Sequence, residues 1–221
     1  MLLMGFSKAD ITPPVGMPLD GHPFRTKTSI GVNDPLFVRS YVFDDGEKEV
    51  ALSVLDILSI DKEFFKEVSR IVYDTVGIRS ENLFIAATHT HSGPIGFFPE
   101  WKFVFKKYPD LELKVGEEYS EEDDYVIAFR KAVIWKTVGS IIEAHSNKKE
   151  VLFGSGIGIE HDVGKNRRDP NGPMDPQVGV LRFDGREGNF LSTIINFSCH
   201  PTVLGRKNLL ISADYPAFTL R

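Results

Sequence analysis

The chain has 221 residues, of which 42% are hydrophobic and 26% charged, and its formal net charge at pH 7 is −5. These proportions are ordinary for a globular protein and exclude the disordered and fibrous classes. A chain of this length favours one domain, over residues 1–221, with a core of its own. The pI near 5.7 and the lack of a Lys/Arg stripe argue against a nucleic-acid partner.

The N-terminal residues and the cysteine count indicate where the protein is located and whether it can contain a disulfide. Residues 1–6 have neither a basic region nor a long apolar stretch, and we therefore expect a cytoplasmic protein. No apolar run approaches the roughly 20 residues that a transmembrane helix needs. Cys199 is the single cysteine, so an internal disulfide is excluded and stability has to come from packing.

The first half of the chain alternates strand and helix signals. Residues 1–35 are rich in proline and glycine and predict loops with short extended pieces. Residues 37–43 and 49–58 read as two strands joined at an Asp-Gly turn. Apolar residues at three- and four-residue steps predict a helix over 61–76, with Gly77 at its C-terminal cap.

The second half continues the same pattern. Residues 83–87 form a short apolar run that is typical of a strand covered on both faces. Residues 97–119 show no clear period and suggest an irregular lid, and 120–145 predict a long helix. Residues 151–161 read as extended, and 178–183 and 191–197 as a hairpin. We therefore predict an α/β fold, a mixed β-sheet with flanking helices, and not a purely parallel sheet.

Two histidines follow the apolar run that ends at Ala87. Side chains two positions apart in a strand share a face, so His89 and His91 are expected on one wall at the strand exit. Neutral imidazole is a common zinc ligand, and the spacing therefore suggests a metal site. The alternative reading, from spacing alone, is a pair of hydrogen-bonded structural histidines.

A third histidine favours the metal site. His200 ends a second apolar strand and is followed by Pro201, which stops the strand. Three histidines at strand exits are expected to gather at one edge of the sheet, where α/β sites usually form. The remaining three, His22, His145 and His161, lack this placement and are predicted to be structural.

Arg167 lies in a polar loop. Its guanidinium suits a carboxylate or a developing oxyanion, although a surface ion pair is an equally good reading of the loop alone.

Five motifs, in this order, resemble the catalytic domain of the neutral/alkaline ceramidase family. The most specific is Thr-His-Thr-His-Ser-Gly-Pro. The motifs are Lys-Ala-Asp-Ile-Thr-Pro at 8–13, Asp-Asp-Gly at 44–46, Thr-His-Thr-His-Ser-Gly-Pro at 88–94, Asn-Arg at 166–167 and Cys-His-Pro at 199–201.

The resemblance implies a zinc-dependent hydrolase that cleaves an N-acyl amide bond of a small-molecule or lipid substrate. His89 and His200 match the two histidine ligands of Zn²⁺. His91 and Arg167 match groups near the substrate carbonyl, so the resemblance gives His89 and His91 different roles. A bound zinc ion lowers the pKa of its water toward about 7 and polarises the carbonyl.

The resemblance also implies an incomplete domain. A glutamate, a tyrosine and a serine complete the family site and come from sequence beyond the position of Arg221. A longer product or a partner chain would supply them, while Asp56 and Asp214 are local alternatives for a third ligand.

The residues also allow two rival hypotheses. One is another metal-dependent hydrolase, acting on a small amide or ester, in which His89 and His91 are both ligands; the other is a non-catalytic fragment or subunit of a split enzyme.

Overall fold

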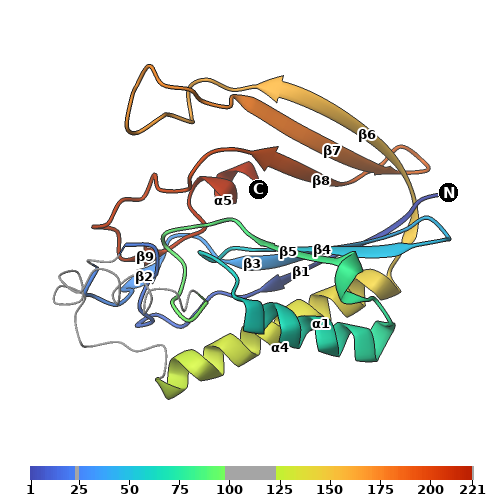
Figure 1. The fold of residues 1–221 in the computed structure, drawn as a ribbon, viewed down its shortest axis with the longest axis horizontal. Helices are drawn as coiled ribbons and strands as arrows, with labels where there is room; N and C mark the ends of the chain where they lie inside the picture. Colours follow the sequence, from blue (N-terminus) through green and yellow to red (C-terminus); the bar gives the residue numbers. More distant parts are fainter. Residues whose placement is uncertain (23–24, 98–122, 221) are drawn as a thin grey trace.

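The computed structural model describes residues 1–22, 25–97 and 123–220, so nearly all of the expected lid at 97–119 lies outside the described residues. Figure 1 shows the strands as two layers with the long helices beneath one of them. The described strands are β1 (Leu3–Asp10), β2 (Gly31–Val32), β3 (Phe37–Asp44), β4 (Glu49–Leu55), β5 (Leu83–Ala87), β6 (Lys149–Ile159), β7 (Gln177–Gly185), β8 (Phe190–Phe197) and β9 (Leu210–Ile211). The described helices are α1 (Lys62–Val76), the 3-10 turn η1 (Ser80–Asn82), α4 (Asp124–Ser146) and α5 (Tyr215–Thr219).

Seven strands form a single mixed sheet in the order β5-β4-β3-β1-β6-β7-β8. The β4–β5 pair is parallel and the other neighbours are antiparallel. The predicted fold class, a mixed sheet with flanking helices, is therefore confirmed. The short strands β2 and β9 pair in parallel beside it.

The sheet folds back on itself through β6. In Figure 1, β6 rises from the layer of β1 and β3–β5 into a second layer with β7 and β8, and α1 and α4 cover the outer face of the first layer. One apolar core lies under the helices, and a smaller one gathers Met4, Tyr41, Val151 and Phe183. The Tyr41 hydroxyl is hydrogen-bonded to Ser192 Oγ at 2.8 Å, which joins β3 to β8.

The loop prediction for the first 35 residues was wrong over β1. This strand pairs with β3 along its whole length and also with β6, so it lies in the middle of the sheet. The prolines and most of the glycines that suggested a loop begin only after Asp10. Gly5, inside the strand, lies so close to the Ala144 carbonyl of α4 that a side chain would clash. That glycine permits close helix packing and does not mark a turn.

The predicted β3–β4 hairpin and the helix ending at Gly77 are confirmed. The side chain of Asp61 accepts a hydrogen bond from Phe64 N at 2.7 Å and caps α1, and Gly77 adopts the left-handed conformation with φ 77°. Arg130 of α4 pairs with Asp61 at 2.6 Å. One carboxylate thus caps α1 and ties it to α4.

The expectation that β5 is covered on both faces was wrong. Among the described residues β5 is an edge strand that pairs only with β4, and Phe84 is 65% exposed. A short apolar run cannot distinguish a central strand from an edge strand.

No helix among the described residues is both long and apolar enough to cross a bilayer.

We expect Asp61→Asn to weaken folding, because asparagine keeps the cap but loses the ion pair with Arg130. Burial alone would raise the pKa of Asp61, but the hydrogen bonds from Arg130 and Phe64 N lower it below 3.8. A lowered pKa stabilises the fold above pH 3.8, and this contribution is lost as the pH falls through the folded-state pKa. Urea unfolding at pH 7 should show a loss of about 1–3 kcal/mol, which shrinks below pH 4. A difference that does not change with pH would contradict the ion pair.

We expect Arg39→Met to destabilise the chain by about 3–5 kcal/mol, because Asp56 would then be a buried, uncompensated charge. Arg39 Nη1 lies 2.8 Å from Asp56 Oδ2, and the aspartate side chain is 0% exposed. The matched control combines Arg39→Met with Asp56→Asn, and it should recover much of the loss in thermal or urea unfolding. A double variant as unstable as the single one would show that the charge of Asp56 is not the cause.

Candidate metal centre

The two histidines of the Thr-His-Thr-His motif follow β5 but lie outside the strand. The backbone continues beside β4, with Thr88 N donating to Leu55 O and His89 N to Ile57 O, at 2.9 and 3.0 Å. His89 then adopts a left-handed conformation with φ 66°. The prediction that strand alternation puts His89 and His91 on one face was therefore wrong in its geometry. The turn nonetheless brings their rings to a centroid distance of 5.1 Å.

The orientation of the His89 ring is set by a backbone group. His89 Nδ1 is 2.7 Å from Leu58 O, just beyond β4. Because a carbonyl only accepts hydrogen bonds, Nδ1 carries the proton and Nε2 keeps its lone pair for a ligand. Metal-binding histidines commonly have a carbonyl partner of this kind.

His200 reaches the same place from the other layer of the sheet. It follows β8, its ring lies 4.9 Å from that of His89, and its Nε2 lies 2.7 Å from His91 Nε2. His89, His91 and His200 are the one group of three potential metal ligands among the described residues, with ligand atoms within 4.8 Å of one another. The expected gathering of strand-exit histidines is thus present.

The three imidazoles fit a zinc ion in chemistry. Burial, and then the nearby His200 and His89, lower the pKa of His91 to about 4. Burial followed by His89 and Arg167 lowers that of His200. His91 and His200 are therefore neutral near pH 7, as metal ligands must be.

Arg167 is exposed, and its charge acts on His200, so its loop lies near the cluster. Neither proposed local carboxylate belongs to the histidine group. Asp56 binds Arg39, and Asp214 accepts hydrogen bonds from the backbone N–H groups of Val203 and Leu204. Asp214 thus holds the turn that follows His200.

His22, predicted to be structural, lies beside the cluster, and its structural role stays a prediction. Its ring lies 5.0 Å from that of His91, so four histidines share the site. Gly21, with φ 89°, packs against the His91 ring, and Arg25 donates to His91 O at 2.9 Å. Sequence reasoning missed this side of the site because the segment carries no periodic pattern. The one local signal is that His22, like His200, directly precedes a proline.

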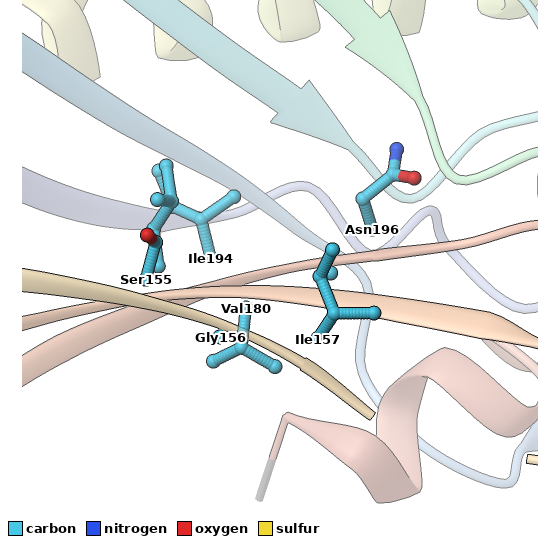
Figure 2. Close-up of a pocket in the computed structure, with 8 residues that line it drawn as sticks. Ser155, Gly156, Ile157, Val180, Ile194 and Asn196 are labelled. Carbon is cyan, nitrogen blue, oxygen red and sulfur yellow. The ribbon is translucent and has the colours of Figure 1, made fainter. Parts of the chain in front are cut away.

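An apolar cavity of about 570 Å³ opens on β6, β7 and β8. Ser155, Ile157, Leu181, Ile194 and Asn196 line the face that also carries Phe183 and Ser192, which is the face turned toward β3. Figure 2 shows Ile194, Ile157 and Asn196 extending from these strands toward the first layer. Asn196 lies four residues before His200, so β8 carries part of the cavity lining and leads to a histidine of the cluster.

Residues 2–218 match the family model described as the N-terminal part of neutral/alkaline non-lysosomal ceramidase. The chain belongs to the ceramidase family. It is 26% identical to the neutral ceramidase of Pseudomonas aeruginosa over 95% of the chain and 32% of that protein. It is 25% identical to the Mycobacterium tuberculosis neutral ceramidase, over 99% of the chain and 35% of that protein.

The solved structures agree with the family. The crystal structure of the P. aeruginosa neutral ceramidase matches with a TM-score of 0.76 at 26% identity, over 96% of this chain and 34% of that one. A ceramidase complexed with C2 gives the same TM-score and covers 33% of that chain. The chain thus spans about a third of the length of the ceramidases it matches.

We expect Gly21→Ala to disturb the cluster, because the added Cβ would lie 2.5 Å from His91 Cγ. The matched control is Gly16→Ala in the same segment, at φ 101° with open space around the new Cβ. Both variants should lose about 1–2 kcal/mol from the left-handed backbone. Only Gly21→Ala should also displace the His91 ring, measured as a shift of the His91 imidazole resonances in NMR spectra. Unchanged His91 resonances in Gly21→Ala would show that Gly21 does not position His91.

Proposed function

We propose that the chain forms the zinc-binding part of a hydrolase that cleaves an N-acyl amide bond. The observation that carries this proposal is the convergence of His89, His91 and His200. His91 and His200 stand 109 positions apart in the sequence and follow strands in different layers of the sheet. Such convergence of imidazoles is typical of a metal site.

The reaction class is supported by the family. Ceramidases hydrolyse the amide bond of ceramide, and the matched relatives carry that name. The apolar cavity on β6–β8 gives an acyl chain a place to lie close to the strand that leads to His200. Ceramide itself is only one N-acyl lipid, so the proposal extends to the bond and not to the particular substrate.

In this proposal the residues at the site have two different roles. His89 and His200 hold the metal, while His91 and Arg167 face the substrate carbonyl. A zinc ion held by these residues would polarise that carbonyl and lower the pKa of a bound water. Leu58 O fixes the tautomer of His89, and Gly21 fixes the ring of His91, so neither side chain has to reorganise when substrate binds.

A catalytic zinc site normally has three protein ligands. His89 and His200 provide two, and we propose that the others belong to the two-thirds of the relatives' length that this chain does not match. The comparisons lend no support to a separate partner chain. Cytoplasmic location also stays a prediction.

Zinc content tests the assignment of the ligands. After zinc loading and dialysis, we expect wild type to retain zinc by elemental analysis, and His89→Ala and His200→Ala to lose most of it. His145→Ala is the matched control, because His145 pairs with Glu49 outside the cluster, and it should retain zinc like wild type. His91→Ala should retain more zinc than the two ligand variants.

Equal zinc in wild type and all the variants would rule out the metal site. If His91→Ala loses zinc as fully as His89→Ala, the rival hydrolase with both histidines of the motif as ligands is favoured. Zinc binding without hydrolysis of N-acyl substrates would support the non-catalytic reading of the isolated chain.

A further inference from the structure

Arg25 is joined to the metal centre by its backbone contacts. Its Nη1 donates to His91 O at 2.9 Å and to Asp20 O at 3.0 Å. The guanidinium therefore lies directly behind a histidine of the cluster. This contact uses only one of its three nitrogens.

The other edge of the guanidinium is buried and has no partner among the described residues. Nε and Nη2 are both shielded from solvent and make no hydrogen bond. These two nitrogens present parallel N–H donors, the arrangement that matches the two oxygens of a carboxylate. Leaving charged donors buried and unpaired is unfavourable, so an anion that accepts from both would gain free energy.

His22 extends the same surface toward the cluster. Its Nε2 is also buried without a hydrogen-bond partner among the described residues, and its ring is 5.0 Å from that of His91. His22 Nε2 is therefore a second buried polar atom, close to Arg25 in the sequence, that can contact a ligand.

The charges around the cluster favour an anion. The positive charges of Arg25 and Arg206 help to lower the pKa of His22, and the charge of Arg167 helps to lower that of His200. Burial lowers the pKa of Arg25 to about 10, and it is still protonated near pH 7. Asp20 offsets part of this charge, and Asp214 lies near His200, but no carboxylate among the described residues belongs to the histidine group.

We propose that the substrate carries a carboxylate beside its amide bond, as N-acyl amino acids do, and that the Nε/Nη2 edge of Arg25 binds it. This inference deepens the proposed function by naming a substrate class, and it rests on that function. A carboxylate is favoured over a phosphate because the free edge offers two parallel donors and a single charge. Arg25 thus selects the substrate, while the histidine cluster serves the amide.

The test compares two ligands that differ only in charge at one end, N-octanoylglycine and N-octanoylglycinamide. Their dissociation constants are measured by calorimetry on the whole chain, with and without zinc. Wild type should bind the carboxylate about 10- to 100-fold more tightly, the range expected for charge-assisted hydrogen bonds. Arg25→Gln should lose this preference. Arg25→Lys keeps the charge but not the paired donors, and it should recover only part of it.

Arg206→Gln is the matched control, since it removes an exposed arginine whose charge is felt at His22 without removing a buried donor. It should change the preference less than threefold. Equal binding of the two ligands by wild type would overturn the proposal whether or not the variants fold. So would an equal loss in Arg206→Gln and Arg25→Gln, or tighter binding of N-octanoylethanolamine phosphate than of the carboxylate.

The zinc content of the same samples separates this inference from the proposed function. If zinc binds through His89 and His200 but the ligands bind equally, the substrate class is wrong and the metal hydrolase stands. If the carboxylate is preferred in a protein that binds no zinc, the anion site stands and the hydrolase proposal fails.

Discussion

The buried ion pair between Arg39 and Asp56 is the constraint on which the geometry of the histidine cluster depends. Asp56 Oδ2 accepts from Arg39 and from the backbone N–H of Phe37, and Asp56 N donates to Phe37 O. These three bonds fix the chain at the point where β4 ends. Because the aspartate is fully buried, the pair holds only with all its partners in place.

The two residues that follow Asp56, Ile57 and Leu58, connect it to His89. Ile57 O accepts from His89 N, and Leu58 O holds His89 Nδ1. Both carbonyls belong to the segment that Asp56 anchors. The position of His89 is thus set by the exit of β4, and the parallel pairing of β4 with β5 brings the two exits together.

The hydrogen bonds from the exit of β4 also explain why His89 can hold a left-handed backbone conformation. A left-handed conformation costs a residue with a side chain about 1–2 kcal/mol. The cost is tolerated because hydrogen bonds fix both the backbone N–H and the ring of His89. Had the chain continued as a strand after Ala87, this support would not determine the ring position. Strain held by its surroundings is typical of a functional site.

The sequence predicted well those features that depend on local chemistry. The β3–β4 turn, the Asp61 and Gly77 caps and the strand-exit histidines each arise from a few neighbouring residues. Features that depend on distant neighbours were not predictable. The central place of β1 depends on its pairing with β3 and β6, and the exposure of β5 depends on where the sheet stops. His22 and Arg25 reach the cluster only because Gly21 packs against the His91 ring.

The contrast between the whole chain and its site bears on how an anionic substrate would be recognised. The chain carries a formal charge of −5, whereas Arg25, Arg167 and Arg206 act on the histidines. Charges separated by more than about 8 Å are largely screened at physiological ionic strength. The net negative charge therefore repels an approaching anion only weakly. The net charge also offers no long-range attraction. A carboxylate ligand would therefore owe its tighter binding, relative to a neutral ligand, to short hydrogen bonds from the buried guanidinium. In such a site the geometry of the donors, more than the rate of encounter, decides which amide is bound.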